Sequence, residues 1–488
     1  MKTLETLSFD NTYAALPETF RQRVSPTVVP SPYLIAFNAD AAKLIDLDPE
    51  EAKRPEFAEY FAGNKLLPGS DPVAMKYAGH QFGHYVPQLG DGRAILLGEV
   101  RNSIGGKWDL HLKGGGQTAF SRMGDGRAVL RSSIREYLCG EAMHALNVPT
   151  TRALCLVGTD MEVYREHQET GALVTRMAPS HVRFGSFEVF AHRGQTDEVK
   201  TLADYVIGLY FPHLVAAEKP YLAFYREVIS RTAELMAHWQ AIGFAHGVMN
   251  TDNMSILGLT LDYGPFGFME DFDPGFICNH SDDTGRYAFD QQPRIGYWNL
   301  ACLGYALMSL IDADDARAAI ETYAPAFNAK MNSLMMAKIG LQTSCDGDLK
   351  LWQDLIDLLA VAKTDYTNYF RILGNFDSSP DARNDGIRQR LKLAPMADEW
   401  FNRYSARLRE ESRTDADRRE AMNQVNPRYV LRNYLAQVAI EKAERKDFGE
   451  IERLMSVLKH PFDDQPEMAH YANPAPAWAR GLHVSCSS

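Results

Sequence analysis

The chain has 488 residues and a formal net charge of −12, with 45% hydrophobic and 23% charged residues. This composition is that of a globular protein with a large core, and the acidic balance argues against a general nucleic-acid binder. Because no apolar run of membrane-spanning length and no signal-like start occur, we expect a cytoplasmic protein that contacts neither membrane nor nucleic acid. The six scattered cysteines form no CxxC pair and support neither a zinc knuckle nor a dense disulfide framework.

The first half of the chain predicts an extension followed by a small sheet. Residues 1–84 mix short helical patterns with proline-rich breaks and should form an N-terminal extension. In residues 85–200, "RAILLGEV" and "WDLHLKG" flank a turn-rich stretch and predict an antiparallel hairpin. A helix is expected over 128–146, and "RALCLVG" and "ALVTRMAPS" read as further strands. This order is typical of the N-lobe of a protein kinase.

The second half is predicted to be helical. An amphipathic helix is expected over 222–243, and "YWNLACLGYALMSLI" is apolar nearly all round, which predicts a buried helix. "LWQDLIDLLAVAKTDYTNYFRIL" and "RYVLRNYLAQVAIEKAERKDF" predict amphipathic helices beyond a minimal kinase. We therefore expect an α+β, protein-kinase-like two-lobed fold, with an N-lobe at 85–200, a C-lobe with the catalytic loop at 201–345, and a helical C-terminal extension with a redox tail at 346–488.

The stretch "HGVMNTDNMSILGLTLDYGPFGFMED" reads as a kinase catalytic loop that has lost its base. His246, Asn253 and the Asp262-Tyr263-Gly264 triplet have kinase spacing, but Val248 stands where kinases carry the catalytic Asp. An amide and a carboxylate oxygen are the ligands that kinases offer to magnesium, so Asn253 and Asp262 are candidate metal ligands. "MSILGLTLDYG" predicts two short strands joined by a tight turn. The alternative is a polar turn that Asp262 merely caps.

Lys113 ends the second strand of the predicted hairpin, where its ammonium group can neutralise phosphate charge. Glu136 lies in the following helix, at the place where kinases carry the carboxylate that orients this lysine. The alternative for both residues is an exposed, solvated side chain.

Two Gly-Asp-Gly-Arg turns are candidate phosphate cradles, since glycine lets backbone amides approach an anion closely. The first contains Gly90, Gly92 and Arg93, and the second contains Asp125 and Gly126 at the mouth of the helix that carries Glu136. Such turns are often only structural.

Arg176 and Arg183 occupy the position of a kinase hinge. A hinge that reads adenine needs no guanidinium groups, so this pair suggests that phosphates lie there. Salt bridges between the lobes are the alternative.

The sequence lacks the motifs of several other enzyme classes. "HQFGH" places His80 and His84 at i and i+4 without the glutamate of a zinc protease, and we expect the two rings to face a core or a neighbouring loop. Neither a G-x-S-x-G elbow nor a P-loop is present.

The chain resembles the selenoprotein O family of kinase-like proteins. The resemblance rests on "YAGHQFGHYVPQLGDGRA", "HLKGGGQTAFSRMGDGRAVLRSSIREYL", "VTRMAPSHVRFGSFE", "HGVMNTDNMSILGLTLDYGPFGFMEDFDP" and the "CSS" tail, and it covers nearly the whole chain. It implies transfer of AMP from ATP to Ser, Thr or Tyr hydroxyls of proteins, with Mg²⁺ or Mn²⁺ as cofactor, UTP as a further candidate donor and a monomeric enzyme. It also implies that ATP binds flipped relative to kinases.

The resemblance further implies roles for individual residues. Asn253 and Asp262 hold the metal, Asp252 is the proton acceptor, and Glu136 is the partner of Lys113. Nucleotide contacts are implied for Gly90, Gly92, Arg93, Lys113, Asp125, Gly126, Arg176 and Arg183. With the nucleotide flipped, the base is no longer needed at Val248.

The resemblance also implies that Cys486, in the tail "HVSCSS", pairs with a cysteine of the loop after Asp-Tyr-Gly, where Cys278 lies. Two other classes of function stay open from the residues alone. One is a phosphotransferase that uses Asp252 as its base, and the other is a nucleotide-binding pseudokinase scaffold without turnover.

Overall fold

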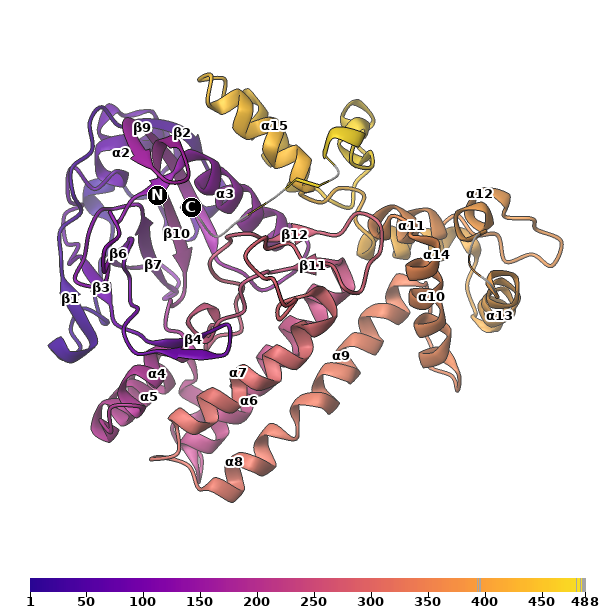
Figure 1. Ribbon diagram of the computed structural model, residues 1–488, viewed down its shortest axis with the longest axis horizontal. Coiled ribbons are helices and arrows are strands. Elements are labelled where there is room, and N and C mark those ends of the chain that lie inside the picture. The colour runs from indigo at the N-terminus through magenta and orange to yellow at the C-terminus, as the bar shows by residue number, and fades with distance from the viewer. Residues whose placement is uncertain (393, 395, 480, 483, 485–488) are drawn as a thin grey trace.

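The computed structural model of the chain describes every residue except 393, 395, 480, 483 and 485–488 (Figure 1). It has the mixed α+β architecture that the sequence predicted. The strands are β1 (Arg21–Arg23), β2 (Tyr33–Phe37), β3 (Val73–Met75), β4 (Gly79–Gln81), β5 (His84–Val86), β6 (Ala94–Arg101), β7 (Lys107–Lys113), β8 (Ala128–Val129), β9 (Arg152–Tyr164), β10 (Gln168–Ala178), β11 (Phe244–Ala245) and β12 (Gly267–Phe268).

The helices follow the sheet and dominate the second half of the chain. They are α1 (Ala39–Lys43), α2 (Pro55–Phe61), α3 (Leu130–Ala145), α4 (Phe184–Ala191), α5 (Thr196–Tyr210), α6 (Pro220–Ile242), α7 (Gln292–Ala306), α8 (Ala313–Ile320), α9 (Tyr323–Lys338), α10 (Asp348–Ala362), α11 (Tyr366–Leu373), α12 (Asp385–Arg388), α13 (Ala397–Glu410), α14 (Asp415–Val425), α15 (Asn433–Ala443) and α16 (Gly449–Leu458). In the described part of the chain, no helix combines the length and apolar character that crossing a bilayer would require.

The main sheet has the strand order β1-β3-β6-β7-β10-β9-β2, and β8 pairs with β10. The predicted hairpin is confirmed, because β6 and β7 pair antiparallel with Ala94 opposite Lys113. The two further predicted strands are confirmed as β9 and β10, which also pair antiparallel. Strands from the first 75 residues form both edges of this sheet.

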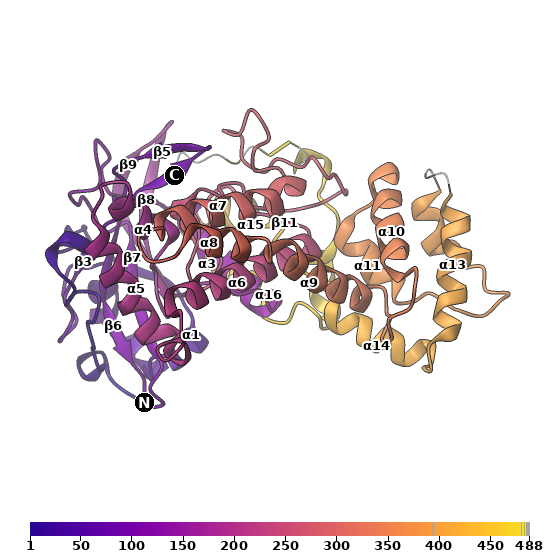
Figure 2. The same cartoon turned by 90° about the horizontal axis from the view of Figure 1, so that it is seen from below.

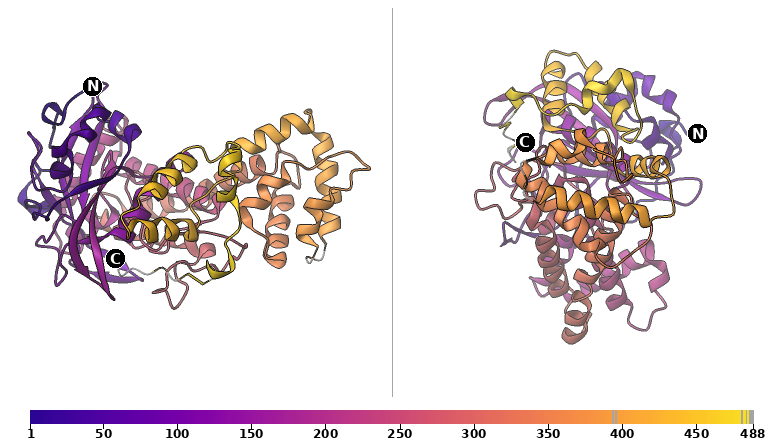
Figure 3. Two further views of the ribbon diagram at one scale, coloured as in Figure 1. Left: turned by 90° about the horizontal axis from the view of Figure 1, so that it is seen from above. Right: turned by 90° about the vertical axis from the view of Figure 1, so that its right-hand side faces the viewer.

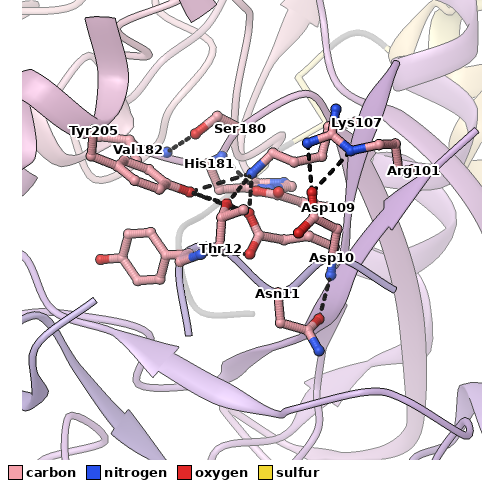
Figure 4. Close-up of polar contacts among 12 residues, drawn as sticks. Asp10, Asn11, Thr12, Arg101, Lys107, Asp109, Ser180, His181, Val182 and Tyr205 are labelled. Atoms are coloured by element: carbon pink, nitrogen blue, oxygen red, sulfur yellow. Dashed lines mark hydrogen bonds and ion pairs between the residues drawn. The ribbon is translucent and has the colours of Figure 1, made fainter. Parts of the chain in front are cut away.

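A buried polar cluster ties the N-terminal segment to the sheet and to α5 (Figure 4). Lys107 on β7 forms an ion pair with Glu99 on β6, and its Nζ donates to Thr12 Oγ1 at 2.8 Å. The hydroxyls of Thr12 and Tyr205 lie 2.9 Å apart, which brings in α5. Because each charge has a partner inside the cluster, the N-terminal segment is held in one position against the sheet.

Helix α3 packs between the sheet and the end of the chain. Its Ile134 and Leu138 are fully buried in the largest hydrophobic cluster. After the remote helices α10 to α14, the chain returns, and α15 and α16 pack on α3 (Figures 1 and 3). A second hydrophobic cluster joins α9, α10, α11 and α13 away from the sheet (Figure 2).

Three local predictions need correction. Helix α7 is not buried all round, because Tyr305 is 64% exposed near its end. The stretch 351–373 forms two helices, α10 and α11, since the chain turns at Lys363 with φ 46°. The two strands expected within 254–264 do not form among the described residues. Met254 and Thr260 meet only in an isolated bridge, and Thr260 bridges also to Thr150.

Candidate active site

The candidate active site is a cavity of about 760 Å³ lined by β6, β7, β10, the two glycine turns and the 248–265 loop. Basic side chains outnumber acidic ones on its wall. The basic ones are Arg93, Lys113, Arg122, Arg127, Arg165, Arg176 and Arg183. The acidic ones are Asp91, Asp125, Asp252 and Asp262. A cavity of this size and charge suits a polyanionic ligand such as a nucleoside triphosphate.

Lys113 and Glu136 are paired inside the cavity wall. The Lys113 Nζ lies 2.6 Å from Glu136 Oε2, and both side chains are almost fully buried. Glu136 Oε1 lies 3.2 Å from Arg176 Nε, so the carboxylate holds two cations. Burial lowers the pKa of Lys113, although Glu136 opposes that change. Helix α3 and strand β7 thus present this lysine in a fixed direction, and the exposed alternative is excluded.

Asp262 is clamped by the two arginines that the sequence singled out. Arg176 and Arg183 each form an ion pair with one oxygen of its carboxylate. Burial alone would raise the pKa of Asp262, but the two guanidinium groups outweigh it and hold that pKa well below its ordinary value. Asp262 also has φ 55°, a left-handed conformation that is uncommon outside glycine. Arg176 on β10 and Arg183 at the start of α4 thus form salt bridges to the 248–265 loop, as the alternative of salt bridges between the lobes expects.

Asp252 lies at the same wall with one carboxylate oxygen unused. Its Oδ2 accepts from Gln81 Nε2 at 3.3 Å, while Oδ1 is buried without a hydrogen-bond partner. Burial raises the pKa of Asp252 to about 7, against the opposing charge of Arg183. A Cβ on Gly79 would lie 2.7 Å from Oδ1, so only glycine lets β4 pass this close. Asp252 lines the cavity, and its Oδ1 is buried against β4 without a hydrogen-bond partner. A buried polar atom without a partner is uncommon in a folded protein and marks Asp252 as a candidate functional residue.

Asn253 and Asp262 both line the cavity and offer oxygen donors to a hard cation. The Asn253 Nδ2 donates to Val248 O at 3.0 Å, which leaves the carboxamide oxygen without a hydrogen bond among the described residues. Amide plus carboxylate is a donor set that fits Mg²⁺ or Mn²⁺ and does not distinguish between them.

Both glycine turns line the cavity. Gly90 has φ 93° and Gly126 has φ 71°, both in the region that favours glycine. Gly92 and Arg93 line the same wall. Asp125 does not point freely at a ligand. Its carboxylate forms a two-pronged ion pair with Arg165, with Nη1 to Oδ2 at 2.8 Å and Nη2 to Oδ1 at 3.0 Å.

Sequence reasoning missed several lining residues. Arg127 directly follows the second Gly-Asp-Gly motif, and its position in the repeated phrase was the available signal. Arg165 lies at the turn between β9 and β10, and only the tertiary fold brings it to Asp125. Gln81 was hidden inside "HQFGH", where the histidines drew attention away from it.

The proposed redox pair is only half within the described part of the chain. Cys278 is buried, and its Sγ lies 3.4 Å from Ala245 O. Cys486 lies outside the described residues. The last described residue, Val484, accepts a hydrogen bond from His280 N at 2.9 Å and so lies beside the loop that contains Cys278.

Comparison with known proteins gives one consistent family. Over residues 3–459 the chain matches the family model described as "Protein adenylyltransferase SelO". It is 60% identical to the "Protein nucleotidyltransferase YdiU" of Myxococcus xanthus over 488 residues, with both chains covered completely. The proteins of the same name from Thiobacillus denitrificans and Thioalkalivibrio sulfidiphilus are each 57% identical, again over the full length of both chains. The chain is therefore a nucleotidyltransferase and belongs to the SelO family of protein adenylyltransferases.

Proposed function

We propose that this protein transfers AMP from ATP to the hydroxyl groups of Ser, Thr or Tyr residues in other proteins and releases pyrophosphate. Membership of the SelO family supports the reaction class. The observation that carries the assignment is the pair of carboxylates on one wall, with Asp262 between two arginines and Asp252 beside it with a free oxygen. UTP is a second candidate donor.

The burial of three cations supports the proposed orientation of the nucleotide. The side chains of Lys113, Arg176 and Arg183 are almost fully buried in the wall of the site. Buried guanidinium groups bind phosphate oxygens in two-pronged geometry far better than they bind a neutral purine. The proposed flipped orientation therefore puts the β- and γ-phosphates against these three side chains.

Asn253 and Asp262 would hold a divalent cation, Mg²⁺ or Mn²⁺. When bound, such an ion neutralises charge on the phosphate oxygens. The Asp262 carboxylate is shared with Arg176 and Arg183, so these three side chains form one positioning unit around the triphosphate.

The residues of this chain divide the chemical work between them. Asp252 accepts the proton of the attacking hydroxyl, since its Oδ1 is buried, unpaired and next to Asn253. The hydroxyl oxygen attacks the α-phosphorus, and the bond to the bridging oxygen of pyrophosphate breaks. Arg176 and Arg183 stabilise the negative charge that develops on that leaving group. AMP transfer then needs no carboxylate at position 248, because a base at that position would serve attack at the γ-phosphorus.

Labelled ATP distinguishes the three classes of function. Incubation with a protein acceptor should leave label from the α-phosphate on protein and none from the γ-phosphate. Label from the γ-phosphate alone would show a phosphotransferase. No label from either position, with nucleotide binding intact, would show a scaffold.

A nucleotide-bound structure tests the orientation directly. We expect the guanidinium groups of Arg176 and Arg183 to contact phosphate oxygens. Adenine packed against residues 174–178 would contradict the flip and favour the kinase-like reaction.

Redox control through a Cys278–Cys486 disulfide is a further part of the proposal. The hydrogen bond between His280 and Val484 supports it, because it brings the chain end to the loop after the metal-binding aspartate. A disulfide there would restrict that loop, and cytosolic disulfides are usually transient and regulatory. A thiol reductant should raise activity, and Cys486→Ala should be active without one. Equal activity under both conditions, with no linked peptide by mass spectrometry, would refute it.

We also propose that the chain forms two kinase-like lobes, with divisions at residues 85, 201 and 346. The same proposal includes a monomeric state and a cytoplasmic location. The order of an antiparallel sheet with α3, followed by the helical α6–α9 region, supports the two lobes.

A further inference from the structure

A second group of metal-ligating side chains lies outside the nucleotide cavity. His80 on β4, Glu188 on α4 and Cys302 on α7 each offer one donor atom, and these three atoms lie within 4.8 Å of one another. The three residues come from separate parts of the sequence, so only the fold brings them together. None of them lines the cavity that holds Asn253 and Asp262.

The carboxylate of Glu188 is the main indication that a cation belongs here. Its side chain is completely buried, and its Oε1 lies 3.1 Å from His80 Nδ1 while Oε2 accepts from the Thr251 hydroxyl at 2.7 Å. Among the residues that the structure describes, no lysine or arginine forms an ion pair with it. A buried carboxylate without a fixed cationic partner is costly, and metal coordination is one of the usual remedies.

The donor set indicates which ion. Thiolate, imidazole and carboxylate together suit zinc, whereas the oxygen-only pair of Asn253 and Asp262 suits magnesium or manganese. Ligands bound to tetrahedral zinc at about 2.0–2.3 Å lie roughly 3.3–3.8 Å from one another, so donors within 4.8 Å need only small side-chain rotations to close on an ion. We propose that His80, Glu188 and Cys302 form a zinc site that fixes β4 beneath the catalytic loop.

The surroundings of the cluster suit a structural ion. The rings of Trp298 and Tyr85 lie 5.3 Å and 5.2 Å from the His80 ring, which shields the site from water. His192 lies one helical turn after Glu188, with its ring 5.7 Å from that of His80, and can supply the fourth ligand in place of water. Burial raises the pKa of the Cys302 thiol to about 12, so zinc binding must displace one proton from sulfur to solvent as the S–Zn bond forms.

The zinc site would position the carboxylate of Asp252 through strand β4. His80 N donates to the Thr251 hydroxyl at 2.7 Å, and the residues on either side of His80 both contact Asp252. An ion that binds His80 therefore holds Gly79 and Gln81 against Asp252 without touching the substrate.

The test uses untagged full-length protein purified without chelator. Elemental analysis should find one zinc per chain in the wild type and in Cys345→Ser, whose exposed thiol lies in the loop between α9 and α10, but none in Cys302→Ser. His84→Ala should also retain the zinc, because His84 is the exposed histidine of the same motif, while His80→Ala should lose it.

A spectroscopic measurement is independent of zinc carried through purification. Cobalt(II) added to chelator-treated wild type should give a thiolate-to-cobalt charge-transfer band that Cys302→Ser lacks and that Asp262→Asn keeps. Wild-type protein that holds no zinc and gives no such band would overturn the proposal. So would a band of equal strength in Cys302→Ser, since the thiolate would then come from another cysteine.

Discussion

Asp252 and Asp262 are alike in chemistry but differ in their surroundings. Asp262 carries two arginine partners, while Asp252 has a single weak side-chain contact and an unpaired oxygen. A carboxylate fixed between cations is suited to binding phosphate and metal, and one with a free lone pair is suited to accepting a proton. The proposed roles of the two aspartates therefore rest on their different side-chain partners more than on their positions in the sequence.

Replacing the proton acceptor should affect turnover more than binding. We expect Asp252→Asn to lower the rate of AMP transfer by a factor on the order of 10² to 10⁴, since it removes a general base but keeps the shape. Nucleotide affinity, measured by calorimetry, should change little. Wild-type turnover in this variant would remove Asp252 from the mechanism.

Replacing the clamped aspartate should have the opposite signature. Asp262→Asn removes the charge that Arg176 and Arg183 hold and a proposed metal ligand, so AMP transfer should be abolished and nucleotide affinity should fall. Asn253→Ala should weaken transfer strongly without changing the arginine clamp. Raising the metal concentration should partly rescue Asn253→Ala and not Asp262→Asn, and equal rescue of both would contradict the shared role.

The buried imidazole of His181 should make the free energy of unfolding depend on pH. Burial, helped by His111 and Arg176 and opposed by Asp109, lowers the pKa of His181 to about 4 from its usual 6.5. Between these values the unfolded chain binds a proton that the folded chain does not, so the free energy of unfolding falls as the pH drops below 6.5 towards 4. Denaturant unfolding at pH 7 and pH 5 should show a smaller acid-induced loss for His181→Gln than for the wild type. An equally steep loss in both would refute the role of this imidazole.

Among the elements, β4 passes very close to the side chain of Asp252. A Cβ at Gly79 would lie 2.7 Å from Asp252 Oδ1 and 2.9 Å from Asp252 Cβ. Gly79→Ala should therefore displace the carboxylate and reduce transfer while the protein stays folded. Gly208→Ala is the matched control, because its Cβ would meet open space on α5 and should stabilise that helix by up to about 1 kcal/mol. A full transfer rate in Gly79→Ala would show that β4 does not position Asp252.

The elements also show why sequence reasoning succeeded in some places and failed in others. Strands β6 and β7 and helix α3 were predictable, since strong apolar periodicity and a turn between them encode local structure. The loop after Asn253 was misread as a hairpin, because Thr260 pairs with the distant Thr150 as well as with Met254. The exposed end of α7 was missed since an apolar sequence does not reveal which face lacks a neighbour. Likewise the Arg165–Asp125 pair depends on a long-range contact with no local signal.

At the scale of the whole molecule, Arg432 joins distant parts of the chain. It is 1% exposed, and it forms ion pairs with Glu270, just after β12, and with Asp365, the N-cap residue of α11. Arg432→Met leaves the buried carboxylate of Asp365 and the partly exposed carboxylate of Glu270 without their cation, so the free energy of unfolding should fall by up to about 3–5 kcal/mol. Lys446→Met breaks the exposed pair with Asp160 and should cost less than about 1 kcal/mol. Equal losses in the two variants would show that the ion pairs of Arg432 do not hold the C-terminal region in place.

The packing of α15 and α16 on helix α3 has a consequence for the protein while it is being synthesised. A ribosome makes the chain from its N-terminus, so α3 emerges long before residues 433–458 can cover it. Glu136 lies on that helix and holds Lys113 in the nucleotide cavity. A nascent chain therefore lacks part of the packing around α3 until synthesis is nearly finished. We expect that the translation machinery, which is rich in exposed hydroxyl groups, is spared modification by an enzyme still attached to it.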